Sequence, residues 1–216
     1  MIDKPWEHPD WYDLHDTTWT AGPEREPEHY REMMLALPPL DARDHLIDVG
    51  AGTGKLAAII AASYPRLGRL TLVEPNEDKL ERARLRLEKI LPSADIRALA
   101  FGLGENSALP KFEATIVSIG SVLMPMMELG GGTLDDGLRW LRASLADVKR
   151  MLKPSAWVYA IETLAAPWAR GSLSDPVRRL NMLELADEFE RAGFQAIECV
   201  YRFRDRIVLR GRSAER

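Results

Sequence analysis

Three glycines stand at alternate positions in a short segment between an apolar strand and a helix. The segment runs from Asp48 to Gly54, and its glycines are Gly50, Gly52 and Gly54. Glycine tolerates positive φ and lets the backbone approach a ligand closely. Because ligands of open α/β sheets bind at the carboxyl ends of strands, we expect this turn to contact a ligand.

Two well-known glycine loops do not fit this spacing. A phosphate-binding P-loop needs a first glycine where Val49 stands and a hydroxyl where Leu56 stands, although Gly54-Lys55 is present. The dinucleotide pattern Gly-x-Gly-x-x-Gly needs a glycine at Lys55. The remaining pattern is an acid followed by Gly-x-Gly-x-Gly.

A second acid, Glu74, directly follows the next apolar segment, residues 69–73. A carboxylate at a strand end can accept charge-assisted hydrogen bonds from both hydroxyls of a ribose. It would repel a 2′-phosphate, which argues against NADP.

Strand and helix patterns alternate along the chain from His45 onward. The predicted strands are 45–49, 69–73, 95–100, 114–119, 157–163, 194–203 and 206–210. The predicted helices are 26–37, 56–63, 78–91, 135–152 and 177–192. Such alternation predicts right-handed crossovers and a doubly wound, Rossmann-like α/β fold. We expect a mostly parallel seven-stranded sheet with helices on both faces and an antiparallel terminal strand.

Residues 46–54 resemble motif I of the class I S-adenosylmethionine-dependent methyltransferases. Further similar segments follow in order, namely 101–105, 112–118, 151–154 and 192–194, so the resemblance covers about residues 30–210. It implies S-adenosylmethionine as the cofactor. The cofactor-binding residues that we predict are Asp48, Gly50, Ala51, Gly52, Gly54, Glu74, Pro75, Gly102, Leu103, Ser118 and Ile119.

Residues 1–30 differ from the rest because they are rich in tryptophan and histidine and lack a long aliphatic run. We predict that they form a lid or a structural brace on a methyltransferase-like domain of residues 31–216. Tyr12 and His15 are catalytic candidates there. A third candidate is Glu162, which ends the strand 157–163 and could act as a base or bond to a helix terminus.

The composition limits the classes of partner that we expect for this chain. The formal net charge is −4, the single cysteine is Cys199, and no apolar segment is long enough to span a membrane. These features predict a cytoplasmic protein without a metal site and without nucleic-acid or membrane partners. Cys199 lies in an apolar run, which predicts a core position.

The function that we predict is methyl transfer to a small-molecule acceptor. The segment after the fourth strand, residues 118–128, lacks the Asn-Pro-Pro-Tyr type sequence of methylases that act on nucleic acid or glutamine. One alternative is attack on the aminocarboxypropyl carbon, such as cyclisation to azetidine-2-carboxylate with release of methylthioadenosine. Another is a non-catalytic cofactor-binding protein. NAD-dependent chemistry is disfavoured by the glycine spacing.

Overall fold

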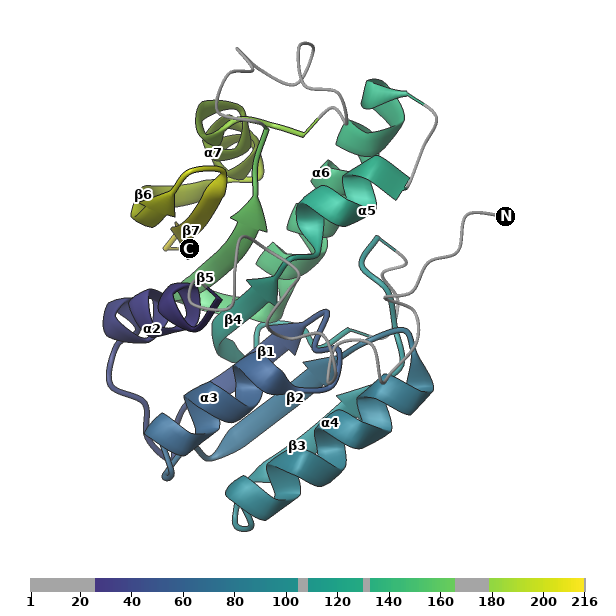
Figure 1. Cartoon of the computed structure of the whole chain (residues 1–216). Coiled ribbons are helices and arrows are strands. Elements are labelled where there is room, and N and C mark those ends of the chain that lie inside the picture. The colour runs from purple at the N-terminus through teal and green to yellow at the C-terminus, as the bar shows by residue number, and fades with distance from the viewer. Residues whose placement is uncertain (1–25, 105–108, 130–132, 166–178, 216) are drawn as a thin grey trace. The chain divides into compact units, whose positions relative to one another are not determined.

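The computed structural model describes residues 26–104, 109–129, 133–165 and 179–215 (Figure 1). Its strands form a seven-stranded sheet in the order β3-β2-β1-β4-β5-β7-β6. The predicted Rossmann-like sheet is thereby confirmed. The chain falls into two compact units, residues 1–101 and 102–216.

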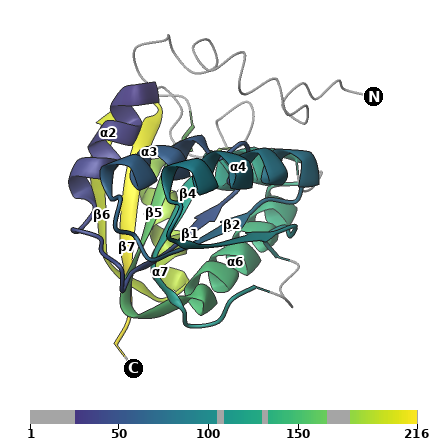
Figure 2. The same cartoon turned by 90° about the horizontal axis from the view of Figure 1, so that it is seen from below.

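In residues 26–101, which the structure describes, the N-terminal unit shows three parallel strands and three helices. The strands are β1 (His45–Val49), β2 (Arg69–Val73) and β3 (Asp95–Leu99). The helices are α2 (Glu26–Ala36), α3 (Lys55–Ser63) and α4 (Glu77–Ile90). Figures 1 and 2 show α3 and α4 side by side on one face of β1 and β2. All five residues of β1 are buried, as its continuous run of mostly apolar residues predicts.

Helix α4 begins where its own sequence provides a cap. The side chain of Asn76 accepts a hydrogen bond from the Lys79 backbone N–H at 3.0 Å. The apolar stripe that the sequence predicts faces inward, with Leu80, Ala83 and Leu87 buried.

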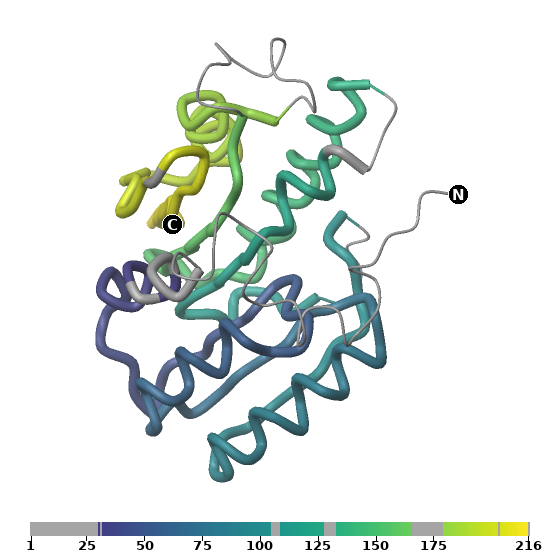
Figure 3. Tube along the Cα trace, viewed as in Figure 1, coloured from purple at the N-terminus to yellow at the C-terminus, as the bar shows by residue number. Residues whose placement is uncertain are grey.

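The described residues of the C-terminal unit form the other four strands and three helices. The strands are β4 (Ala114–Gly120), β5 (Leu152–Thr163), β6 (Phe194–Phe203) and β7 (Arg206–Ser213). The helices are α5 (Leu123–Leu129), α6 (Leu134–Met151) and α7 (Met182–Arg191). Strands β4 and β5 are parallel, whereas β7 is antiparallel to both β5 and β6. In the Cα trace of Figure 3 the chain passes from the end of β4 directly into α5.

Helix α5 was not expected from the sequence, which predicts a loop after β4. It has seven residues and contains Pro125, so neither length nor periodicity marks it. It packs along α6, where a Cβ on Gly137 would lie 2.8 Å from the Met127 carbonyl oxygen. The missing side chain at Gly137 therefore permits this close approach.

Four further expectations need correction. Strand β5 begins at Leu152 rather than at residue 157, and β7 extends to Ser213. Helix α7 begins at Met182 rather than at residue 177, because Asn181 and Glu184 form a capping box. Cys199 is exposed, since β6 is the last strand of the sheet.

Candidate cofactor and acceptor sites

The glycine turn after β1 is tied to the end of β2. The backbone N–H groups of Gly50 and Ala51 both donate to the Val73 carbonyl oxygen, at 2.8 and 3.1 Å. Gly50, Gly52 and Gly54 have φ values of 68°, 52° and 80°. This left-handed conformation favours glycine and explains why the three glycines occupy these positions.

Two of these glycines face different surroundings. A Cβ on Gly54 would lie 2.9 Å from the Ala83 Cβ, so this glycine lets α4 pack against the turn. A Cβ on Gly52 would meet nothing nearer than the Gly50 carbonyl oxygen at 4.0 Å. The backbone at Gly52 thus has an open side within the part of the chain that the structure describes.

Glu74 is held beside that open side. It is 8% exposed, its Oε2 accepts the Gly52 N–H at 3.0 Å, and its Oε1 accepts the Asn76 N–H at 3.1 Å. A carboxylate has about four lone-pair directions, so each oxygen can accept a further bond. The arrangement fits a ribose diol, as the sequence predicts. Asp48, at the end of β1, is buried.

The segment after β3 is fixed from α6. The Gly104 backbone N–H donates to Oδ2 of the buried Asp147 at 2.7 Å, and Arg150 pairs with Oδ1 of the same carboxylate. Gly104 has a φ of 84°. Asp147 therefore anchors the segment that contains the predicted cofactor residues Gly102 and Leu103. The sequence analysis missed it because an acid on a helix usually lies in solvent.

The last residues of β4 and the residue after it differ in their exposure. Ser118 and Ile119 are fully buried, whereas Gly120 and Ser121 are partly exposed. Ser121 has a φ of 54°, which is unusual for a residue other than glycine. The accessible part of this strand end is therefore Gly120–Ser121, and the cofactor contacts of Ser118 and Ile119 stay predictions.

Glu162, the third catalytic candidate, is fully buried and bonds to the start of α5. Its Oε1 accepts the N–H groups of Val122 and Leu123 at 3.1 and 2.8 Å, and its Oε2 accepts that of Met124 at 3.2 Å. Burial raises the pKa of this carboxyl to about 7, although the three N–H donors and Arg206 oppose the rise. The geometry matches the helix-terminus role that the sequence left open.

Comparison with known proteins gives two curated relatives and many similar structures. A release factor glutamine methyltransferase of Koribacter versatilis is 32% identical over 35% of this chain and 26% of its own length. One of Thermosynechococcus vestitus is 26% identical over 72% of this chain and 58% of its own length. The chain thus spans about a quarter and under three fifths of these relatives. No family model matches.

Solved structures cover the chain more fully. An S-adenosylmethionine-dependent methyltransferase of Aquifex aeolicus matches with a TM-score of 0.64 and 16% identity, over 96% of this chain and 99% of that one. This likeness shows that the chain has the fold of S-adenosylmethionine-dependent methyltransferases. The fold agrees with the sequence prediction.

Two other solved structures widen the comparison. A complex of the Haloferax volcanii Trm112 methyltransferase activator with a putative methyltransferase matches over 100% of both chains, with a TM-score of 0.66 and 12% identity. The [4+2]-cyclase SpnF matches with a TM-score of 0.64 and 14% identity, over 99% of this chain and 98% of that one. At these identities the likeness shows the fold.

The partners that the sequence predicted for this chain are wrong. We expected a small-molecule substrate and no nucleic acid, but both curated relatives are named for acting on a release factor, which is a protein. A solved neighbour is in complex with a protein activator. The absence of an added domain was a poor guide to the substrate, because a core fold can bind a large substrate without one.

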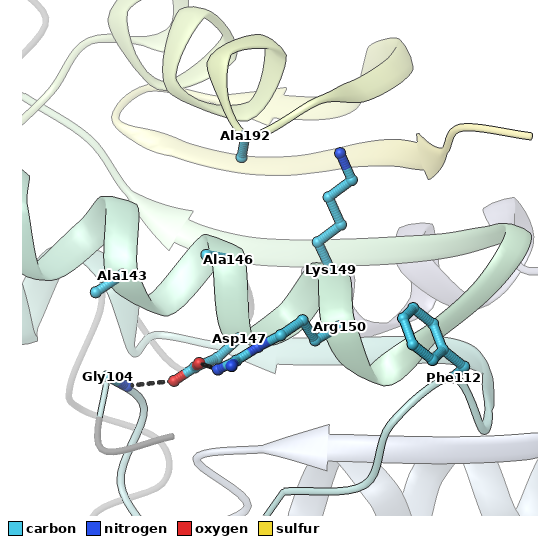
Figure 4. A pocket seen from close by; sticks show the side chains of 8 residues that line it. All are labelled: Gly104, Phe112, Ala143, Ala146, Asp147, Lys149, Arg150 and Ala192. Atoms are coloured by element: carbon cyan, nitrogen blue, oxygen red, sulfur yellow. Dashed lines mark hydrogen bonds and ion pairs between the residues drawn. The ribbon is translucent and has the colours of Figure 1, made fainter. Parts of the chain in front are cut away.

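A shallow hollow of about 550 Å³ lies beside α6, within the C-terminal unit (Figure 4). Its lining includes Phe112, Ala143, Ala146 and the Asp147–Arg150 pair. None of the predicted site residues lines it. Its charged pair is already used to hold Gly104 (Figure 4).

Tyr12 and His15, like most of the predicted lid or brace, lie outside the described residues. Their roles stay predictions, as does the domain boundary at residue 30. Among the described residues no group of His, Cys, Asp and Glu could hold a metal ion. No described helix is long and apolar enough to cross a membrane.

Proposed function

We propose that this protein binds S-adenosylmethionine at the glycine turn and transfers its methyl group to a protein side chain. The observation that carries the proposal is the Glu74 carboxylate, oriented by the Gly52 and Asn76 N–H groups beside an open backbone. When bound, S-adenosylmethionine would supply an electrophilic methyl group.

The chain's own task in this reaction is to bind and orient. Glu74 would accept the ribose hydroxyls, and the open side of Gly52 leaves room for the cofactor's amino-acid part. Methyl transfer is an in-line displacement, so alignment of the acceptor and exclusion of water account for much of its acceleration.

The proposed acceptor class is supported by the names of the two curated relatives. Those proteins are named for methylating glutamine of a release factor. At the end of β4 this chain has Ser118-Ile119-Gly120-Ser121 and no Asn-Pro-Pro-Tyr type sequence. We therefore propose a polypeptide acceptor with a side chain other than the glutamine amide.

The first experiment incubates the pure protein with S-adenosylmethionine alone and identifies the nucleoside products by mass spectrometry. Bound, unchanged cofactor is the expected result, because methyl transfer needs an acceptor. Methylthioadenosine well above the uncatalysed background would instead mean that the aminocarboxypropyl bond breaks. Calorimetry that detects no binding would overturn the cofactor assignment itself.

The second experiment tests the acceptor class with methyl-labelled S-adenosylmethionine and a cell extract. We expect acid-precipitable label that protease releases and nuclease does not. Label that is sensitive only to nuclease, or that stays entirely in the small-molecule fraction, would contradict a polypeptide acceptor. A Glu74→Ala protein serves as the control for background labelling.

A further inference from the structure

Four consecutive N–H groups at the start of α5 are held by two consecutive residues of β5. The Ser121 N–H donates to the Ile161 carbonyl oxygen at 2.7 Å. The next three N–H groups, those of residues 122–124, donate to the Glu162 carboxylate. The turn between β4 and α5 is thus fixed by contacts with a strand about 40 residues later in the chain.

These bonds complete the first turn of α5. The first N–H groups of a helix have no partner within the helix. Pro125 has no N–H, and the Met126 N–H reaches the Val122 carbonyl oxygen at 3.0 Å. Val122 precedes the helix but has no polar side chain that could cap it. Glu162 therefore takes over the capping role from a distant strand.

The turn depends on this anchor for its shape. Ser121 has a φ of 54°, a conformation that costs energy for a residue with a Cβ. A seven-residue helix is also too short to be stable by itself. Both features require contacts from outside the segment, and the Ile161 and Glu162 bonds supply them.

The carboxylate that supplies the anchor is itself surrounded by protein. Glu162 is fully buried, and its two oxygens together accept three backbone N–H groups. The neighbouring charged group is the buried Arg206 of β7. An acid in this setting is poorly placed to take a proton from an acceptor.

We propose that Glu162 is a positioning residue that fixes the Gly120–Met124 turn, where the proposed methyl transfer would hold its acceptor. It acts through the backbone of this turn rather than on the reacting atoms. The part of this inference that assigns the acceptor to the turn rests on the proposed function.

The test is amide hydrogen exchange of the full chain, read at residues 121–124 in Glu162→Gln and Glu162→Ala. The amide of Gln has one acceptor oxygen, which can keep the bonds to Val122 and Leu123 while its NH₂ group faces the Met124 N–H. We expect exchange at Met124 to become about tenfold faster or more in Glu162→Gln. In Glu162→Ala all three amides should exchange faster.

The exposed Glu190→Gln is the matched control and should leave these amides unchanged. Unchanged exchange at 122–124 in Glu162→Ala would overturn the proposal. S-adenosylmethionine affinity, measured by calorimetry, should be the same in all variants, because Glu162 does not bind the cofactor in this scheme. Failure of the wild-type protein to bind S-adenosylmethionine would instead refute the proposed function and leave the exchange result standing.

Kinetics with the labelled protein acceptor separate positioning from proton transfer. Glu162→Gln should raise KM for the acceptor more than it lowers kcat, since a misplaced turn weakens binding first. A loss confined to kcat, with normal exchange at residues 122–124, would show that Glu162 acts on the reacting atoms.

Discussion

At the scale of single residues, Glu74 connects the glycine turn to the predicted ribose site. Glu74→Ala removes an acceptor of charge-assisted hydrogen bonds, so S-adenosylmethionine binding should weaken by about 2 kcal/mol or more, roughly thirtyfold. Calorimetry measures this loss. Glu77→Ala, in the exposed first turn of α4, should bind as the wild type does. Equal affinities in the two variants would place the ribose elsewhere.

Gly52 and Gly54 make a matched pair for separating binding from folding. Gly54→Ala adds a Cβ at 2.9 Å from the Ala83 Cβ and strains a φ of 80°, so it should lower the free energy of unfolding by more than Gly52→Ala. Gly52→Ala meets open space and should cost about 1–2 kcal/mol of strain. Urea denaturation compares the two.

Gly52→Ala should also separate ligand binding from stability. Gly52→Ala places a methyl group in the space that the cofactor is proposed to occupy, so it should lose affinity although it remains folded. Tight S-adenosylmethionine binding by folded Gly52→Ala would show that this open side is not the cofactor's place.

At the scale of elements, α6 acts as a support for the segment after β3. Asp147→Ala leaves the Gly104 N–H without its acceptor and Arg150 without its partner. We expect cofactor affinity to fall about tenfold, because Gly102 and Leu103 lose their fixed position. Asp135→Ala, in the exposed first turn of α6, is the control. If both variants bind equally, the segment does not contribute to the cofactor site.

Glu162, buried at the end of β5, should make the free energy of unfolding depend on pH. The pKa of Glu162 is raised from 4.5 to about 7 in the folded chain, so the folded state binds this proton more tightly than the unfolded state does. The stabilising contribution is fully present below pH 4.5 and is lost as the pH rises through about 7. It amounts to at most about 3 kcal/mol.

Denaturation of Glu162→Gln between pH 5 and 8 checks this prediction. The variant should show a flatter decline of the free energy of unfolding than the wild type, whereas Glu190→Gln should follow the wild type. Parallel curves for Glu162→Gln and the wild type would mean that the carboxyl titrates normally.

At the scale of the whole molecule, the proposed S-adenosylmethionine site predicts which cofactor stabilises the fold. S-adenosylmethionine at about 100 times its Kd should raise the free energy of unfolding by about 2.7 kcal/mol. NAD at the same concentration should have little effect, because the glycine spacing lacks the dinucleotide pattern. Thermal denaturation with each ligand makes the comparison, and stabilisation by NAD would revive the rejected alternative.

Most of the fold could be predicted from local sequence patterns. Several features depend only on residues that are close together in the sequence. They are the apolar runs of β1 and β2, the Asn76 cap and the apolar stripe of α4. The glycine turn was recognisable for the same reason, since positive φ at fixed intervals demands glycine. The place of Glu74 followed because strand ends can be read from where an apolar run stops.

What the sequence could not reveal depends on residues far apart in the chain. Helix α5 has no cap of its own, and Glu162 supplies it from a strand about 40 residues later. Asp147 holds Gly104 across a similar separation. Cys199 looked apolar in sequence, but the position of β6 at the end of the sheet exposes it. Periodicity records local preference, whereas tertiary packing alone determines which distant carboxylate meets which backbone N–H group.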